Sequence, residues 1–195
     1  MALDVASRTI AAPNYSQIQK DLEEQELQAP GGVGSPQLYS QLLALYLLHN
    51  EMCQAKFLWK RIPQSVKSTT PELTMIWTAG QKMWQRDYPG SYEALKKEYS
   101  VEVKPIMDEA LEAYRRRAFH LVSQAYSSIN GDELATFLGM SITDAVQAAR
   151  AEGWEADAQT RFITPKKPAG VQVDPEFKSD QQLSVLTDYV SFLES

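Results

Sequence analysis

The sequence has little cysteine and no long hydrophobic run, and both absences limit what the protein can be. Cys53 is the single cysteine among 195 residues, so no disulfide can form within the chain. Its apolar helical surroundings favour a buried, unreactive thiol. The longest apolar run, residues 42–48, is far too short to span a bilayer. Asp4 and Arg8 interrupt the layout of a signal peptide, and we therefore expect an intracellular, soluble protein.

The sequence also lacks the residue patterns of common enzyme sites. Two histidines are present, His49 and His120, and they lie too far apart in sequence to form the His pair of a zinc site. Each interrupts an apolar helical stretch, which favours a structural role. No nucleophile elbow, phosphate-binding loop or dinucleotide-binding glycine motif occurs, and pairs such as Glu23-Glu24 lie on polar helix faces. We predict no catalytic, metal-binding or cofactor-binding site.

Positive charge is scarce as well. The chain holds 19 basic and 25 acidic residues, a net charge of −6 with a pI near 5.0. This balance disfavours nucleic acids and anionic membranes as partners, because both repel an acidic surface. The imbalance is strongest between residues 118 and 164, a stretch that contains six acidic residues and only two arginines.

This acidic stretch nevertheless carries the element pattern of a winged helix. Asn130 and Ser141 are N-cap residues for two short helices, and Gly139 and Gly153 end them. Two short helices joined by a glycine-containing turn form a helix-turn-helix. Two short strands of a small β-wing are predicted to follow, at residues 154–156 and 161–163. A DNA-reading module would be rich in Lys and Arg here, so we interpret the unit as protein-binding.

The remainder of the chain is predicted to be helical, which makes the fold class mainly α. Proline-based helix starts and apolar periodicity predict helices at residues 15–28, 38–49, 51–62, 71–86, 92–99 and 105–126. The run Tyr88-Pro89-Gly90 is predicted to end the fourth of these helices. Such paired helices resemble a tetratricopeptide-like helical-repeat array. The predicted divisions are an N-terminal tail (1–13), the helical array (14–117), the winged-helix subdomain (118–164), a linker (165–178) and a C-terminal helix (179–195).

The C-terminal helix has apolar side chains over about half of its circumference. They are Leu183, Val185, Leu186, Tyr189, Val190, Phe192 and Leu193. So broad a stripe requires a groove. The helix either packs back on its own domain or enters a bundle with helices from other chains, and the periodicity leaves both interpretations open.

Two further residue sets allow more than one interpretation. The basic run 115–117 could meet an acidic or phosphorylated partner. Alternatively, its side chains fan around a helix and pair with Glu112 and Asp108, one turn back. Burial of a large indole ring removes much apolar surface from water. We therefore predict core or inter-helix positions for Trp59, Trp77, Trp84 and Trp154.

Several longer segments resemble a known family. They are residues 42–50, 57–63, 84–90, 115–119, 121–126, 153–154 and 186–194. Together they resemble the smallest PCI-domain subunits of the COP9 signalosome, over residues 25–194. The runs 58–63 and 187–194 are long enough to be specific for that family rather than for PCI proteins at large.

The resemblance implies a non-catalytic subunit of an assembly that removes the ubiquitin-like modifier Nedd8 from cullins, in nucleus and cytoplasm. It implies that the winged helix pairs edge to edge with another PCI subunit, subunit three, and that the C-terminal helices of all subunits form a bundle. The interface residues we expect are Arg161, Phe162 and Ile163 in the wing and Leu183, Leu186, Tyr189, Val190 and Leu193 in the C-terminal helix. The alternatives are a winged-helix nucleic-acid regulator, or a PCI scaffold subunit of the proteasome lid or of a translation initiation complex.

Overall fold

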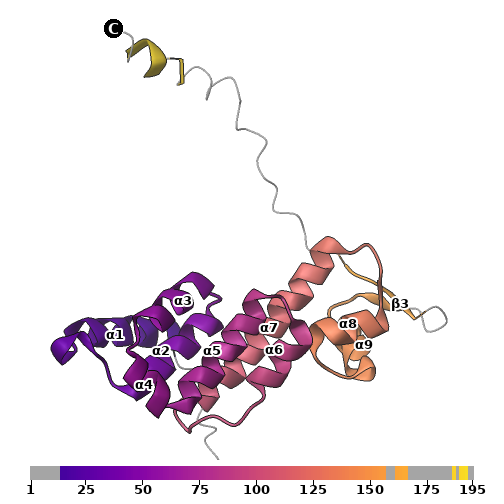
Figure 1. Ribbon diagram of the computed structural model, residues 1–195. Helices are drawn as coiled ribbons and strands as arrows, with labels where there is room; N and C mark the ends of the chain where they lie inside the picture. Colours follow the sequence, from indigo (N-terminus) through magenta and orange to yellow (C-terminus); the bar gives the residue numbers. More distant parts are fainter. Residues whose placement is uncertain (1–13, 157–160, 167–185, 188, 193–195) are drawn as a thin grey trace, which may run out of the picture.

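The computed structural model describes residues 14–156, 161–166, 186–187 and 189–192. This part of the chain is mainly helical, which confirms the predicted fold class (Figure 1). The elements of the helical array are α1 (Tyr15–Gln28), η1 (Pro30–Gly32), α2 (Pro36–Leu48), α3 (Met52–Arg61), α4 (Gln64–Thr69), α5 (Pro71–Trp84), α6 (Tyr88–Leu95) and α7 (Lys104–Ala125). None of the described helices is long and apolar enough to cross a membrane.

Helix α2 lies at the centre of the array. Ser35 caps its N-terminus by accepting the Leu38 N–H at 3.2 Å, and Pro36 occupies the first turn. Its side chains are apolar on nearly every face, and α1, α3, α5 and α7 all contact it. Leu42 and Leu43 are completely buried. Each fully buried leucine contributes about 1.5–3 kcal/mol to the free energy of folding. Helix α2 therefore stabilises the array by burying nearly all of its faces rather than one amphipathic stripe.

The start of α6 differs from the prediction. The run Tyr88-Pro89-Gly90 was expected to end one helix, but it begins the next. The Asp87 carboxylate accepts the Gly90 N–H at 3.1 Å, and Pro89 sits in the first turn, where its missing N–H costs no hydrogen bond. The helix predicted at residues 92–99 therefore starts four residues earlier, and the short helix α4 was not predicted at all.

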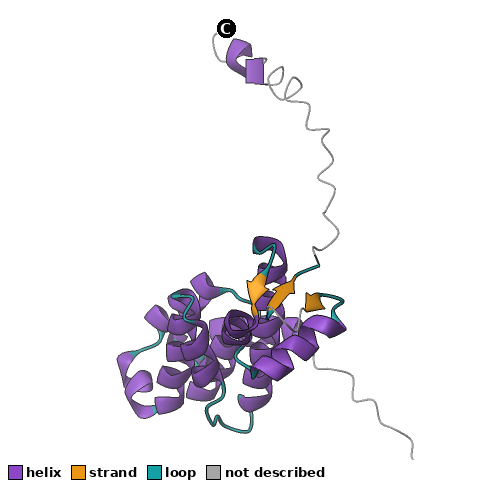
Figure 2. Ribbon diagram, turned by 90° about the vertical axis from the view of Figure 1, so that its right-hand side faces the viewer, coloured by secondary structure: helices purple, strands orange, loops and turns teal. Residues whose placement is uncertain are grey.

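The C-terminal part of the array joins a small α/β unit. Its elements are β1 (Ile129–Asn130), α8 (Gly131–Leu138), α9 (Ile142–Ala151), β2 (Glu155–Ala156) and β3 (Phe162–Thr164). The strands form an antiparallel sheet in the order β1-β3-β2, and Figure 2 shows them side by side. The order strand, helix, helix, strand, strand is compatible with a winged helix, and that assignment stays a prediction; β1 was not predicted.

Local signals set the helix ends of this unit. The Asn130 side chain accepts the Asp132 N–H at 3.0 Å, and the Ser141 hydroxyl accepts the Asp144 N–H at 3.2 Å. Helix α8 ends at Gly139, whose φ of 62° lies in the left-handed region that favours glycine. The two caps and the stop therefore act as the sequence predicted.

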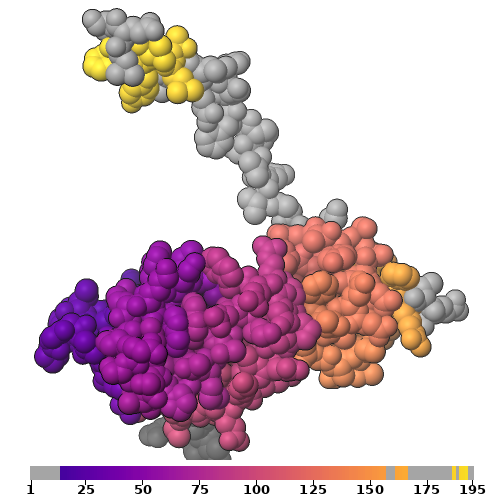
Figure 3. Space-filling model, in the orientation of Figure 1, coloured from indigo at the N-terminus to yellow at the C-terminus, as the bar shows by residue number. Residues whose placement is uncertain are grey.

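Two hydrophobic cores meet on α7. The core of the array reaches Tyr114, and the core of the α/β unit begins at Ala118, one turn later on the same helix. The Tyr92 hydroxyl of α6 donates to the Phe137 carbonyl of α8 at 2.9 Å, so a second contact joins the two parts. Figure 3 shows the α/β unit as a direct continuation of the array. The division at residues 117 and 118 stays a prediction, because α7 runs unbroken across it.

Candidate protein-interaction site

The sheet places the predicted wing residues in its middle strand. Strand β3 pairs with β1 on one side and β2 on the other, and Ile163 lies opposite both Ile129 and Ala156. The Arg161 carbonyl accepts the Gly131 N–H at 3.0 Å. Because these backbone groups are already paired within the chain, β3 cannot offer an edge to a partner. The prediction that residues 161–163 supply the backbone edge is therefore wrong; among the described strands, β1 and β2 are the edges.

The side chains of β3 have different exposures. Ile163 is 2% exposed and belongs to the core of the α/β unit, so its predicted place in an interface is wrong as well. Phe162 is 48% exposed, and Arg161 is also on the surface. These two remain candidate contact residues. The exposure of Phe162 beside the buried Ile163 follows from the alternation of side chains along a strand. Arg161 precedes β3 and has a left-handed φ of 58°.

A hollow of about 420 Å³ lies next to the sheet edge. It is lined by Asn130, Gly131, Asp132, Ile142, Thr143, Val146, Ala156, Arg161 and Ile163. Ile142 is 49% exposed. Since β1 contributes Asn130 and β2 contributes Ala156, a partner that adds a strand to either edge would also reach this hollow.

Acidic side chains of the α/β unit have local structural roles. Asp132 and Glu133 lie in the first turn of α8, Asp144 lies in the first turn of α9, and Arg150 lies in the last turn of α9. Each charge opposes the helix dipole at its own end and so stabilises the helix. The same placement leaves α9, the helix that would enter a DNA groove, with little positive charge.

The C-terminal helix is described in part, at residues 186–187 and 189–192 (Figure 1, yellow). Leu186, Tyr189 and Val190 are 60%, 65% and 52% exposed. Their spacing places them on one face of a helix. Leu183 and Leu193, the other predicted interface residues, lie outside the described residues. An apolar face of this kind marks an interaction site, and its assignment to a bundle stays a prediction.

Polar contacts hold α1 against the array. The Tyr46 hydroxyl donates to the Glu23 carboxylate at 3.0 Å, and Arg61 makes two hydrogen bonds to Glu26, at 2.7 and 2.8 Å. Burial raises the pKa of Tyr46 above its ordinary value, and the hydrogen bond to Glu23 raises it further. These residues are therefore structural.

The histidines and the cysteine do not form a site. The His49 ring contacts the Gln19 side chain of α1, and His120 contacts Gln124 one turn along α7. No group of three or more His, Cys, Asp or Glu side chains suited to a metal occurs among the described residues. Cys53 is exposed, contrary to the prediction, because α3 buries Ala55 and thus turns Cys53 away from the core.

The basic run on α7 divides into three separate contacts. The first two side chains pair with acidic residues of the same helix, Arg115 with Glu112 at 2.6 Å and Arg116 with Glu109 at 2.8 Å. Arg117 donates from Nη1 to the Leu48 carbonyl at the end of α2, at 2.8 Å. Burial lowers its pKa. The interpretation that these residues fan around the helix is thus confirmed, although the second acidic partner is Glu109, two turns before Arg116, rather than Asp108.

Three of the four tryptophans have the inter-helix positions that we predicted. Trp59 and Trp77 stack with ring centroids 5.3 Å apart, between α3 and α5, and the buried Trp154 stacks on Phe119 at 4.1 Å. Trp84 is 57% exposed, so its prediction as an anchor is wrong.

Comparison with known proteins agrees with this architecture. A family model described as the CSN8/PSMD8/EIF3K family matches residues 34–172. A relative from Xenopus tropicalis, named COP9 signalosome complex subunit 8, is 51% identical over 183 residues, which cover 93% of this chain and 94% of the relative. Proteins of the same name from Danio rerio and Arabidopsis thaliana are 51% and 39% identical, covering 89% and 80% of this chain and 91% and 79% of the relatives. The chain therefore belongs to the CSN8/PSMD8/EIF3K family and, within it, to the COP9 signalosome complex subunit 8 proteins.

Proposed function

We propose that the chain is a non-catalytic, structural subunit of the COP9 signalosome, the assembly that removes Nedd8 from cullins of cullin-RING ubiquitin ligases. Its similarity to subunit 8 proteins over nearly its whole length supports membership of the complex. The observation that carries the structural role is the exposed apolar face of the C-terminal helix, formed by Leu186, Tyr189 and Val190. Burial of each of these side chains would contribute about 1.5–3 kcal/mol to association.

The proposed partners are other signalosome subunits. The C-terminal helix enters a bundle with the C-terminal helices of the remaining subunits. The α/β unit pairs with the PCI subunit three through β1 or β2, because β3 is occupied on both sides. We further propose that the protein acts in both nucleus and cytoplasm, with its assembly.

The experiment compares two substitutions on the C-terminal helix. Leu186→Asp puts a charge into the apolar face, whereas Ser191→Asp adds the same charge at an exposed polar position of the same helix. Tagged full-length chains are expressed in cells and the complex is isolated by gel filtration. The Leu186→Asp protein should fail to join the large complex and should elute as the free subunit. The Ser191→Asp protein should co-elute with the complex. Equal incorporation of both variants would refute the role of this helix.

Catalysis and nucleic-acid binding are tested directly on the isolated chain. Purified protein with zinc should leave a neddylated cullin intact, since none of the described residues forms a metal cluster. In an electrophoretic assay at low salt, the full-length chain should give no shift of random-sequence DNA, because its α/β unit is acidic. Cleavage, or a shift lost at high salt, would instead favour an enzyme or the nucleic-acid regulator.

A further inference from the structure

The segment from residue 52 to residue 86 has a positive net charge, opposite in sign to that of the whole chain. It holds six basic residues and one acidic residue, whereas the rest of the chain holds 13 basic and 24 acidic residues. The basic residues are Lys56, Lys60, Arg61, Lys67, Lys82 and Arg86. The segment comprises α3, α4 and α5, which pack against one another, so this charge is concentrated on one part of the array.

Most of this charge is not neutralised by the residues that the structure describes. Arg61 pairs with Glu26 and Lys82 pairs with Asp87, each at 2.7 Å. The other four, Lys56, Lys60, Lys67 and Arg86, form no ion pair with any described residue. Unpaired cations this close together create a positive potential that attracts anionic groups.

Aromatic rings lie directly under two of these lysines. The Lys67 Nζ is 4.8 Å from the ring centroid of Trp59, which stacks on Trp77. The Lys56 Nζ is 5.6 Å from the ring centroid of the exposed Trp84. Lysines over indole faces are held in place by cation–π attraction, so their charges are positioned rather than free to move. We call Lys56, Trp59, Lys67, Trp77 and Trp84 the aromatic–lysine face.

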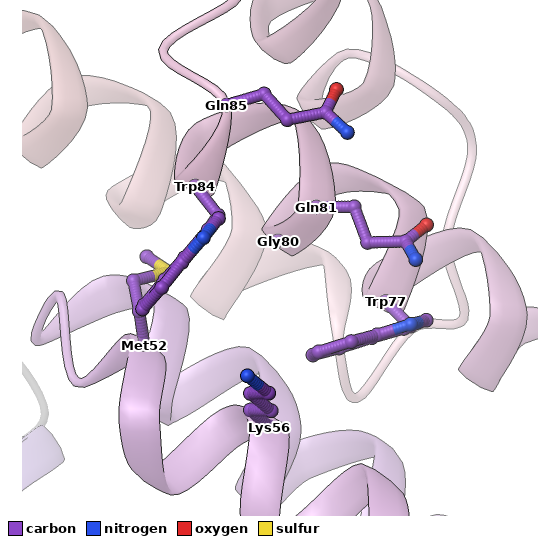
Figure 4. Close-up of a pocket in the computed structure, with 7 residues that line it drawn as sticks. All are labelled: Met52, Lys56, Trp77, Gly80, Gln81, Trp84 and Gln85. Carbon is purple, nitrogen blue, oxygen red and sulfur yellow. The ribbon is translucent and has the colours of Figure 1, made fainter.

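A hollow opens in the aromatic–lysine face between α3 and α5. Its volume is about 200 Å³, and its lining comprises Met52, Lys56, Trp77, Gly80, Gln81, Trp84 and Gln85. Figure 4 shows the rings of Trp77 and Trp84 on its two sides, with Lys56 rising between them from α3. The space suits one large apolar side chain, and the adjacent Gln81 and Gln85 amides can hydrogen-bond a backbone. Trp and Met, which line this hollow, are residue types enriched at protein interfaces.

We propose that the aromatic–lysine face docks an acidic peptide segment of another protein. A large apolar side chain of the segment enters between Trp77 and Trp84, and its carboxylates pair with Lys56 and Lys67. A nucleic acid fits less well, because a long phosphate backbone would extend beyond four unpaired cations onto the acidic remainder of the chain. A short acidic segment can end within the positive area. The site lies on α3, α4 and α5, and it shares no residue with the α/β unit or the C-terminal helix.

The experiment measures binding to the full-length chain by fluorescence anisotropy at low salt. The probes are three fluorescein-labelled peptides of equal length and a single-stranded oligodeoxythymidine. The first peptide surrounds Phe and Leu with Glu and Asp; the second has Gln and Asn in place of the acids; the third keeps the acids and has Ser in place of Phe and Leu. The test variants are Trp84→Ala and Lys56→Gln. The controls are Leu121→Ala, an exposed apolar side chain of α7, and Lys97→Gln, an exposed lysine outside the face.

The first peptide should bind wild-type protein at least about tenfold more tightly than the other two, a difference of about 1.4 kcal/mol. Trp84→Ala and Lys56→Gln should each weaken binding severalfold, the controls should not, and added salt should weaken the wild-type complex. Undetectable binding of the first peptide, or binding that the test variants do not change, would overturn the proposal. Tighter binding of the oligonucleotide, lost in the test variants, would assign the face to nucleic acid instead.

Discussion

Replacement of Gly139 by alanine tests how the array and the α/β unit fit together. A Cβ atom added to Gly139 would overlap Cδ2 and Cγ of the Tyr92 ring. These atoms lie at the base of the ring, and Tyr92 is 2% exposed with its hydroxyl bonded to the Phe137 carbonyl. The ring therefore cannot move aside without loss of packing and of that hydrogen bond.

The expected loss has two parts. A left-handed φ costs alanine about 1 kcal/mol relative to glycine. Overpacking of a filled site and loss of the Tyr92 hydrogen bond add about 2 kcal/mol. Since each kcal/mol shifts the melting temperature of a protein of this size by about 2–4 °C, Gly139→Ala should lower Tm by about 6–12 °C.

Gly153→Ala is the matched control. Gly153 has a φ of 76°, but among the described residues a Cβ there would meet only the Lys166 side chain, at 4.0 Å. Gly153→Ala should therefore lower the free energy of unfolding only by the conformational cost of the left-handed φ, about 1 kcal/mol. Calorimetry or urea unfolding should show a larger loss of stability for Gly139→Ala than for Gly153→Ala. When Tyr92 is also replaced by alanine, the loss caused by Gly139→Ala should fall to that caused by Gly153→Ala. Equal losses at both glycines, or an unchanged loss without the Tyr92 ring, would refute the steric argument.

Three further outcomes are expected. Ile163→Asp should lower the free energy of unfolding by about 3 kcal/mol or more, because it buries an unpaired charge, whereas Phe162→Asp on the surface should change it by about 0.5 kcal/mol or less in the same urea titration. The ion pair with Lys82 lowers the pKa of Asp87; wild type should therefore be more stable than Asp87→Asn at neutral pH and lose this advantage as the pH falls through that pKa, in unfolding curves measured across the acidic range. Tyr46→Phe should lower the free energy of unfolding by about 1 kcal/mol, because the hydrogen bond to Glu23 is lost, and this should be measured as a lower Tm.

Short-range signals predicted most helix ends correctly. A cap followed by proline at Ser35-Pro36 and a left-handed glycine at Gly139 act within one turn, so neighbouring residues are sufficient to recognise them. The error at residues 88–90 came from treating proline and glycine as a stop, although Asp87 already provided the cap of a start. The exposure of Cys53 could likewise have been derived, because the spacing of Ala55 and Leu58 sets the buried face of α3.

Long-range pairing could not be predicted in the same way. Strand β1 has two residues and owes its existence to β3, more than 30 positions later in the chain. Nothing in the wing sequence shows that β3 has neighbours on both sides, and the edge was therefore assigned to the wrong strand. The exposure of Trp84 is similar, since it depends on which helices pack beside the last turn of α5. The excess of basic residues between 52 and 86, by contrast, was available from the sequence and was overlooked.

The unbroken helix α7 has a consequence for how this protein could be divided or recombined. Its 22 residues supply Tyr114 to one core and Ala118 to the other. A cut between the two would leave each fragment with a partial helix and an uncovered core, so neither half is a self-contained module. Gene fusion or exchange of the C-terminal unit between relatives should succeed only when the whole of α7 is transferred with it. Helix α7 is therefore the element that any such exchange must keep whole, because both cores depend on it.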